Sequence, residues 1–356
     1  MSVPITIAVT GMNARPDNPG PGLAVARCLK ETRDFECRII GLSYDALDPG
    51  LYLDDYCDAG YLLPYPSAGE EAFMARLENI QQREQIDILI PCLDAELPGV
   101  IRAEAQINQL GIRTFLPSAE QLKLRNKDKL PELAEHAGLH CPRIVSITRS
   151  DFFDDCQDDD WHFPLVVKGL FYDARIVYSI EQAKQAFRAI AAEWGFPVLV
   201  QAFVKGQEYN LTALGDGQGR MLSAVMMKKM ALTDKGKAWA GVTIDDPVLY
   251  QASEQLINRI DWRGPLEVEV LKDHNGRYQL LEINPRFPAW IYLSHGAGRN
   301  SPAALVKLMQ GYPQDPDAAL NTGIMFIRYA QEAIVPIIEF ERFVVDGAGH
   351  EKGPAS

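Results

Sequence analysis

The 356-residue chain lacks several features that would assign it to a common class. No apolar run is long enough to cross a bilayer, which excludes a helical membrane span. The six cysteines include no C-x-x-C pair and indicate reduced thiols rather than a disulfide framework or a zinc site. The sequence also has no Walker A motif, no G-x-S-x-G elbow, no G-x-G-x-x-G fingerprint and no spaced histidine cluster. It therefore gives no support to a P-loop enzyme, a serine hydrolase or a dinucleotide site.

Basic residues are scarce, since 35 lysines and arginines face 48 acidic residues and give a net charge of −13. Such a chain repels phosphate backbones and anionic lipids, so we expect neither nucleic acid nor membranes as partners. Any phosphate chemistry must depend on a local basic pocket. The N-terminal segment MSVPITIAVTG enters a strand-like run without a basic leader, which predicts a cytoplasmic protein. A hydrophobic content of 47% predicts a well-packed globular protein of two or three domains.

The first third of the sequence alternates apolar strands with helices. This pattern predicts a parallel sheet covered on both faces, in a domain spanning residues 1–118. The expected strands include 6–10, 38–42 and 87–92, and the expected helices are 23–31, 70–83 and 96–110.

The rest of the chain predicts two further parts and a tail. Residues 119–202 read as connector helices followed by a small α+β unit, in which the acidic run 151–160 is a solvated loop. Residues 203–346 are rich in strands, and their last apolar segment, 334–345, reads as an edge element. The polar, glycine-rich residues 347–356 are expected to be disordered.

The most informative segment is LEVEVLKDHNGRYQLLEINPR, residues 266–286. Its two alternating halves and central turn predict a β-hairpin. Even-offset pairings set Glu267 or Glu269 against Glu282, with Asn284 on the same face. Two carboxylates and an amide oxygen suit Mg²⁺ that bridges protein and nucleotide phosphates.

The alternative for this segment is an exposed amphipathic hairpin whose acids face water. However, the strand ends at Pro285, and Asn284 and Arg286 on either side of it are unusual choices for a plain edge. We therefore favour the metal site over the exposed hairpin.

Two lysines and one interdomain stretch also suggest nucleotide binding. Lys129 lies at a helix start and Lys168 at a strand end, where their ammonium groups could clamp phosphate oxygens. Each lysine taken singly is typical of a solvated surface. Backbone groups at Phe203 and Val204 could read an adenine edge, and Glu208 could bind ribose hydroxyls. The alternative is an ordinary crossover between domains.

Further polar residues are candidates for substrate binding. Asp94 and Glu96 follow the strand 87–92, and ligands of parallel sheets lie beyond carboxyl strand ends. One of the two could bind an amine. Lysines near the expected nucleotide mouth could steer phosphate or an acidic substrate, or form a flexible basic loop. They are Lys228, Lys229, Lys235 and Lys237.

The segment LLEINPRF, residues 280–287, resembles the E-x-N-P-R signature of the ATP-grasp superfamily of ATP-dependent ligases. The nearest likeness is to carbamoyl-phosphate-synthase-like and PylC-like carboxylate–amine ligases, and it covers nearly the whole chain. The resemblance implies an α/β and α+β fold, in which a parallel-sheet pre-ATP-grasp domain precedes a two-part ATP-grasp domain with a mobile lid.

The resemblance also assigns roles to residues. It implies ATP and Mg²⁺, or Mn²⁺, as cofactors, with Glu269 rather than Glu267 as a metal ligand beside Glu282 and Asn284. Arg286 would contact the transferred phosphoryl group and the substrate, and Lys168 would assist catalysis. The residues implied in ATP binding are Lys129, Lys168, Gln201, Phe203, Val204, Glu208, Glu269 and Glu282.

Two positions depart from the family pattern. Residues 169–175 contain one glycine where relatives commonly have a glycine-rich loop over the phosphates, so a backbone phosphate nest is not expected there. Arg175 could supply charge in its place. Gln201 stands where related ligases often have glutamate.

The resemblance implies an ATP-dependent carboxylate–amine ligase that forms an acyl phosphate and releases ADP and phosphate. Its substrates would be small molecules or peptides. Many relatives dimerise, so a homodimer is one candidate state, and the sequence itself leaves the oligomeric state open. One alternative is a bicarbonate-using carboxylase or carbamoyl-phosphate-type ligase. Another is a catalytically silent nucleotide-binding scaffold, which the short lid loop favours and the intact signature opposes.

Overall fold

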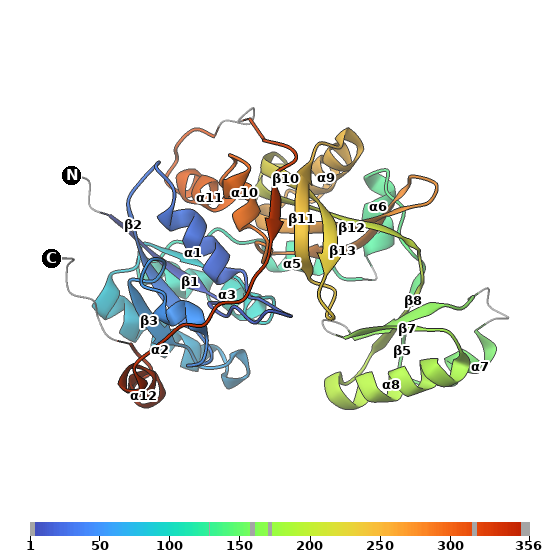
Figure 1. Cartoon of the computed structure of the whole chain (residues 1–356), viewed down its shortest axis with the longest axis horizontal. Helices are drawn as coiled ribbons and strands as arrows, with labels where there is room; N and C mark the ends of the chain where they lie inside the picture. Colours follow the sequence, from blue (N-terminus) through green and yellow to red (C-terminus); the bar gives the residue numbers. More distant parts are fainter. Residues whose placement is uncertain (1–3, 128, 157–160, 170–172, 315–318, 350–356) are drawn as a thin grey trace.

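A computed structural model describes residues 4–127, 129–156, 161–169, 173–314 and 319–349. Three sheets organise these residues, and the smallest unit projects from one end of the molecule (Figure 1). Within the described ranges, no helix is both long enough and apolar enough to cross a membrane.

The N-terminal domain contains the predicted parallel sheet, which has four strands in the order β3-β2-β1-β4. Buried apolar side chains cover both of its faces, which explains why its strands are apolar throughout. The helix expected at 96–110 is divided in two. The elements are β1 (Ile5–Thr10), α1 (Gly22–Lys30), β2 (Cys37–Ser43), β3 (Ala59–Leu62), α2 (Glu70–Glu84), β4 (Ile88–Ile90), α3 (Leu97–Arg102) and α4 (Glu104–Gln109).

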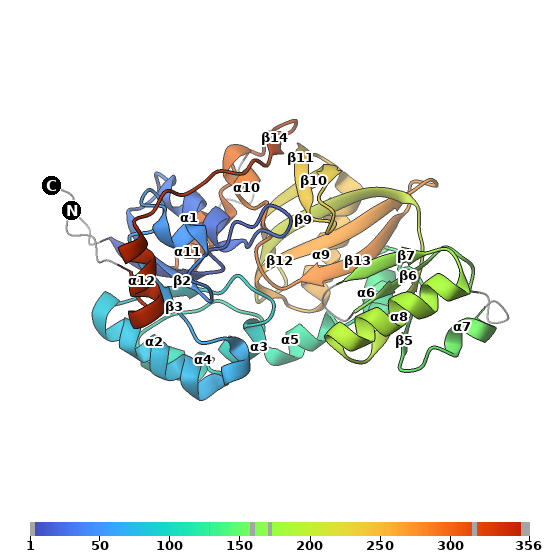
Figure 2. The same ribbon diagram turned by 60° about the horizontal axis from the view of Figure 1, so that its bottom comes forward.

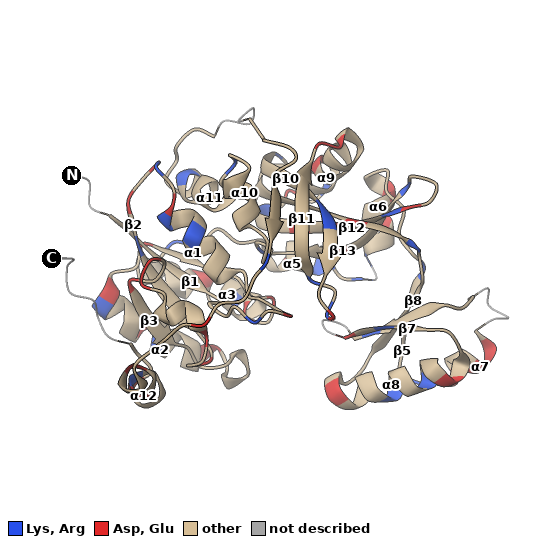
Figure 3. Cartoon of the chain, in the orientation of Figure 1, with Lys and Arg blue, Asp and Glu red and all other residues tan. Residues whose placement is uncertain are grey.

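Two short connector helices, α5 (Ala119–Leu124) and α6 (Leu130–His136), lead to a separate unit that we call the lid, residues 143–202. Its antiparallel sheet has the order β5-β8-β6-β7. Helix α8 packs its apolar side on this sheet, and its charged positions lie outward (Figure 3). The lid elements are β5 (Ile144–Ile147), α7 (Phe152–Asp155), β6 (Leu165–Lys168), β7 (Ala174–Val177), α8 (Ile180–Trp194) and β8 (Val198–Ala202).

The acidic run 151–160 was expected to be a loop, but its first half forms α7, and Phe153 in that helix is buried. Residues 157–160 lie outside the described residues.

A six-stranded antiparallel sheet follows, with the order β13-β12-β9-β10-β11-β14. Strand β11 and the short edge strand β14 were not predicted from the sequence. The strands are β9 (Gly206–Asp216), β10 (Met221–Leu232), β11 (Ala238–Ile244), β12 (Arg263–Asp273), β13 (Tyr278–Asn284) and β14 (Met325–Ile327). The helices are α9 (Pro247–Arg259), α10 (Tyr292–Gly296) and α11 (Ser301–Met309).

The C-terminal segment returns to the N-terminal domain (Figure 2). The edge element expected at 334–345 is instead helix α12 (Ile337–Asp346), whose Phe343 enters the N-terminal core. Immediately after it, the Leu62 N–H donates to the Gly347 carbonyl at 2.8 Å. The tail expected to be disordered from 347 is therefore paired with the parallel sheet as far as residue 349, and 350–356 lie outside the described residues.

The N-terminal domain and the six-stranded sheet share one buried core. Val9 and Leu29 from the first region belong to the same apolar cluster as Leu214, Phe287 and Leu305 from the second. This packing fixes the carboxyl edge of the parallel sheet against the β12–β13 hairpin.

Candidate active site

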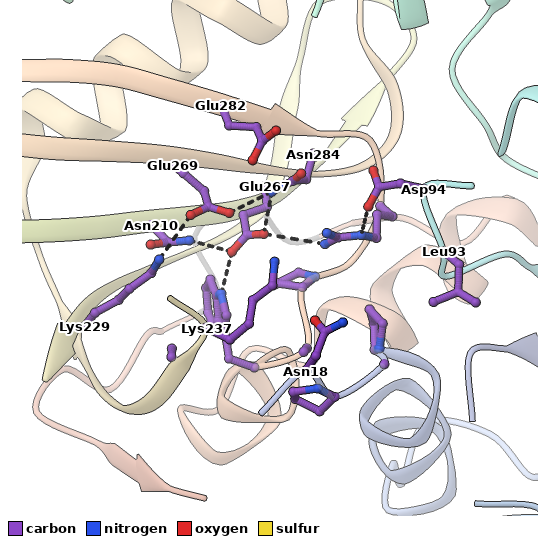
Figure 4. Close-up of a pocket in the computed structure, with 18 of the residues that line it drawn as sticks. Asn18, Leu93, Asp94, Asn210, Lys229, Lys237, Glu267, Glu269, Glu282 and Asn284 are labelled. Atoms are coloured by element: carbon purple, nitrogen blue, oxygen red, sulfur yellow. Dashed lines mark hydrogen bonds and ion pairs between the residues drawn. The ribbon is translucent and has the colours of Figure 1, made fainter. Parts of the chain in front are cut away.

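The β12–β13 hairpin brings the predicted acidic residues onto one face. Glu269 is directly opposite Glu282, and Glu267 is opposite Asn284. A register shift follows Glu269 in the ladder. Opposed residues of an antiparallel pair point to the same side, so all four side chains converge there (Figure 4).

Glu267 is a buried anchor of this face. Its carboxylate accepts hydrogen bonds from Asn210 Nδ2 and Trp290 Nε1, both at 2.6 Å, and from Asn284 Nδ2 at 3.0 Å. Burial raises its pKa, and the neighbouring Glu269 adds to that effect. Because these donors occupy Glu267, it is less available to an incoming cation than Glu269.

Glu269 is held ionised by a buried lysine from β10. Lys229 Nζ lies 3.1 Å from Glu269 Oε2 and 2.7 Å from Glu208 Oε2. Although burial opposes ionisation, Lys229 and Lys237 lower the pKa of Glu269 to about 2. Lys229 was one of four lysines whose role the sequence left open. Periodicity could not single it out, because Lys228 directly precedes it in the same strand.

Arg286 connects the hairpin to the N-terminal domain. Its Nε donates to Asp94 Oδ2 at 2.7 Å, and its NH1 lies 3.6 Å from Glu267 Oε2. Burial favours a neutral Asp94, but Arg286 outweighs it and lowers the pKa of Asp94. The structure therefore brings Asp94 into the site beside the signature arginine.

Glu96 does not reach the site, contrary to the expectation that it could bind an amine. It is buried beneath the loop after β4, where it accepts the N–H groups of Cys92 and Leu93 at 2.9 Å each. The hydroxyls of Thr10 and Tyr44 donate to it as well. Both carboxylate oxygens are thus used to hold this loop in place.

The structure also replaces one predicted lysine with its neighbour. Lys129 is exposed at the start of α6 and lies with Glu132 and His136 on another surface. Lys127 instead places Nζ 3.7 Å from Glu282 Oε1. The motif NKDK offers two lysines two positions apart in an irregular loop, so periodicity gave no means to choose between them.

Lys168 joins Lys127 from the lid side. Its Nζ donates to Gln201 Oε1, which explains how a glutamine serves at that position. Burial and the nearby Lys127 ammonium lower the pKa of Lys168 to about 8. Phe203 and Val204 follow directly, in the short link between β8 and β9.

The lid loop after β6 was expected to lack a phosphate nest. Residues 170–172 lie outside the described residues. Arg175, the proposed substitute for a phosphate nest, forms an ion pair with Asp173 at 2.7 Å. The charge of Arg175 is therefore paired with Asp173 in this structure.

Asp94, Arg286, Lys229 and the four hairpin side chains line a cavity of about 140 Å³ between the N-terminal domain and the six-stranded sheet (Figure 4). Asn13 and Asn18 line it from the loop before α1, and Lys237 lines it from the start of β11. The β10–β11 turn closes over that loop, since Lys235 pairs with Asp17 at 2.9 Å. Three of the four candidate lysines therefore lie at this cavity, since Lys229 and Lys237 line it and Lys235 connects two loops at its rim.

The donor set suits a hard divalent cation. No group of three or more histidine, cysteine, aspartate or glutamate side chains is arranged for a metal in the described part of the chain. Glu269 and Glu282 nevertheless offer carboxylates, and Asn284 uses only its amide nitrogen in bonds within the cluster. Three oxygen donors of this kind fit Mg²⁺ that takes its other ligands from phosphates and water.

Comparisons with known proteins agree with this geometry. Residues 196–332 match the family described as ATP-grasp in the biosynthetic pathway with Ter operon. The segment runs from the end of the lid through the six-stranded sheet and contains the hairpin. The resemblance to the ATP-grasp superfamily of ligases is thereby confirmed.

The chain is similar to the D-alanine–D-alanine ligase of Chromohalobacter salexigens, with 25% identity over 174 residues. The match covers 45% of this chain and 54% of that ligase, so the chain spans about half the length of this curated relative.

Two solved structures share the fold over most of the chain. The biotin carboxylase domain dimer of Hydrogenobacter thermophilus 2-oxoglutarate carboxylase, in complex with MgADP, ADP and bicarbonate, has a TM-score of 0.68 and 13% identity. The match covers 90% of this chain and 73% of that one. The L-amino acid ligase of Bacillus licheniformis has a TM-score of 0.62 and 16% identity, covering 86% of this chain and 74% of that one. These likenesses confirm the predicted fold class.

Proposed function

We propose that the protein is an ATP-dependent carboxylate–amine ligase. The observation that carries this proposal is the meeting of Glu269, Glu282 and Asn284 with Arg286 around one cavity, with Lys127 beside Glu282. The D-alanine–D-alanine ligase and L-amino acid ligase among its relatives support amide formation as the reaction.

In the proposed reaction, a substrate carboxylate oxygen attacks the γ-phosphorus of ATP, and the bond to ADP breaks. An amine then attacks the acyl phosphate carbon, the amide forms, and phosphate leaves. Lys127 and Lys168 bind phosphate oxygens, and Arg286 stabilises the charge that spreads over the transferred group. Mg²⁺ held by Glu269, Glu282 and Asn284 would neutralise phosphate charge when bound.

Water must be kept from the acyl phosphate, because hydrolysis would waste it. The lid carries Lys168 and Gln201 on the strands nearest the site, so its closure would bring cations and cover together. We propose that this unit closes on nucleotide.

The sharpest test removes one carboxylate and keeps its shape. We expect Glu282→Gln to reduce substrate-dependent ADP release by about 100-fold or more, since preorganised charge is lost where phosphate charge develops. The matched control is Glu254→Gln on the exposed side of α9, which should retain full turnover. Normal turnover in Glu282→Gln would remove the metal assignment.

The same assay separates the alternatives. ADP release that needs bicarbonate but no amine would identify a carboxylase or carbamoyl-phosphate-type ligase, a possibility supported by the bicarbonate-bound relative. Tight ATP binding without ADP release across a substrate matrix would identify a scaffold.

We also propose a homodimer formed through the edge strand β14. Met325, Ile327 and Tyr329 alternate along this edge and are 52%, 62% and 68% exposed. A second copy could extend the sheet there and bury these side chains. Light scattering on the purified chain tests this arrangement, and a monomer at all concentrations would reject it.

The free thiols support the predicted cytoplasmic location.

A further inference from the structure

The loop that brings Asp94 into the candidate site has no helix or strand of its own. It spans residues 91–96, between β4 and α3. Asp94 Oδ2 accepts the hydrogen bond of Arg286 Nε at 2.7 Å. NH1 of the same guanidinium donates to the Phe287 carbonyl at 3.2 Å and lies 3.6 Å from Glu267 Oε2. The direction of the Nε side of Arg286 therefore depends on where this loop places Asp94.

A buried carboxylate two residues further on determines the path of the loop. Glu96 Oε1 accepts the backbone N–H groups of Cys92 and Leu93 at 2.9 Å each. These are the two residues directly before Asp94. Hydrogen bonds to a carboxylate are stronger than those to neutral oxygens, and a buried carboxylate without them would cost free energy. The Glu96 side chain and the backbone that leads to Asp94 therefore hold each other in place.

Glu96 also joins this loop to the parallel sheet. The hydroxyl of Thr10, the last residue of β1, donates to Oε1, and the hydroxyl of Tyr44, the residue after β2, donates to Oε2. The Tyr44 ring stacks on the Tyr65 ring at a centroid distance of 5.9 Å. Glu96 is only 4% exposed and does not line the cavity. It is thus a buried link between the carboxyl ends of two strands and the loop that carries Asp94.

We propose that Glu96 is a positioning residue, which acts through Asp94 to orient Arg286 toward the phosphoryl group transferred in the proposed reaction. The catalytic consequence rests on the proposed ligase function, whereas the orientation of Arg286 does not. Glu96 touches neither nucleotide nor substrate in this role, so its effect must pass through the hydrogen bond between Asp94 and Arg286. That dependence separates positioning from a general contribution to folding.

The exchange of the Arg286 Nε–H with water tests the orientation directly. NMR measures it in the full chain without any substrate, and the signal is assigned by its loss in Arg286→Lys. Glu96→Ala should increase the exchange rate about tenfold, since the loop loses its acceptor and Asp94 its fixed place. Glu96→Gln should keep the native rate, because its amide oxygen can accept the same donors while its nitrogen donates to the Tyr44 hydroxyl.

Glu84 provides the matched control in the same domain. It is 3% exposed and accepts hydrogen bonds from Arg38 and from the Tyr61 hydroxyl, neither of which lines the cavity. Glu84→Ala should lower the melting temperature as Glu96→Ala does and leave the exchange of the Arg286 Nε–H unchanged.

Tyr44→Phe carries the test if Glu96→Ala fails to fold. This variant removes one donor from Glu96 and keeps the ring that stacks on Tyr65. It should increase the exchange rate of the Arg286 Nε–H about threefold.

Kinetics test the consequence for the reaction. With any substrate pair that releases ADP, Glu96→Ala should lower kcat about tenfold and change the KM for ATP less than twofold, because Lys127 and Lys168 still bind the phosphates. In an Asp94→Asn background, Glu96→Ala should lower kcat by less than a further twofold, since both substitutions act on the same contact to Arg286.

The outcomes separate this inference from the proposed function. Native exchange of the Arg286 Nε–H in Tyr44→Phe and in folded Glu96→Ala would overturn the positioning role and leave the ligase proposal standing. An equal increase in Glu84→Ala, or an unchanged kcat in Glu96→Ala, would overturn it as well. If exchange increases only in the Glu96→Ala and Tyr44→Phe variants but no pairing of substrates releases ADP, the orientation of Arg286 by Glu96 is supported and the ligase function is rejected.

Discussion

The lid and the rest of the molecule are held together in different ways. The lid has its own apolar core, in which Phe153, Val167 and Ile190 pack among lid residues alone. In contrast, the N-terminal domain and the six-stranded sheet share a core that includes Val9 and Phe287. The two larger regions therefore share one continuous core, and the lid is a separately packed unit attached to them.

This difference separates the roles of the two regions. The shared core fixes Asp94 against Arg286, so the substrate end of the cavity is assembled before any ligand arrives. The lid approaches the site with polar residues, since Lys168 faces Lys127 and Glu282 there. Charged contacts between the lid and the site can break and re-form at low cost in water. Separating a shared apolar core would expose apolar surface and cost much more free energy.

The largest expected effect comes from breaking the shared core. Phe287→Ala should lower the free energy of unfolding by about 3–5 kcal/mol, because it opens a cavity where two regions meet. Hydrogen exchange should increase in both the parallel sheet and the six-stranded sheet. Phe153→Ala makes the same change in the lid core, and its increased exchange should stay within residues 143–202. If exchange also increased outside the lid in this variant, the lid would not be a separately packed unit.

A smaller effect is expected at the charged residues that lie between the lid and the rest of the molecule. Lys127→Met should weaken ATP turnover by about 100-fold, since it removes a cation beside Glu282 from the proposed phosphate site. Lys129→Met is the matched control and should change turnover less than twofold, because that side chain lies on another surface. Steady-state ADP release measures both, and equal losses would reverse the assignment.

The smallest effect is a dependence on pH carried by Lys168. Its pKa is lowered from 10.5 to about 8, so between these values the unfolded chain binds more protons and this group makes stability rise with pH. ATP affinity should move oppositely and fall about tenfold by one unit above the folded pKa, as the ammonium is lost. Lys168→Arg should keep ATP affinity level across this range, and an unchanged slope in that variant would exclude Lys168 as the cause.

The sequence predicted local patterns well. Alternation over residues 266–284 identified the hairpin and the shared face of Glu282 and Asn284, because side-chain direction in a strand depends only on spacing. Uninterrupted apolar strands likewise predicted the parallel sheet. Spacing alone left the choice between Glu267 and Glu269 open, because both lie on the same face of the hairpin, and only the resemblance to the family favoured Glu269.

Long-range pairings were beyond such patterns. Asp94 and Arg286 are 192 positions apart, and no periodicity connects them. The helix α12 was misread because its apolar residues suit an edge strand as well as a helix with one buried side. Arg328 was not predicted to line the cavity, because a single arginine after a short strand belongs to no recognisable pattern.

The return of the chain to its first domain affects how the protein is made. The Gly347 carbonyl accepts a hydrogen bond from Arg76, a residue made 271 positions earlier. During translation the apolar site that Phe343 fills therefore stays uncovered until the C-terminal residues have been synthesised. Apolar surface exposed in this way makes a nascent chain prone to aggregation.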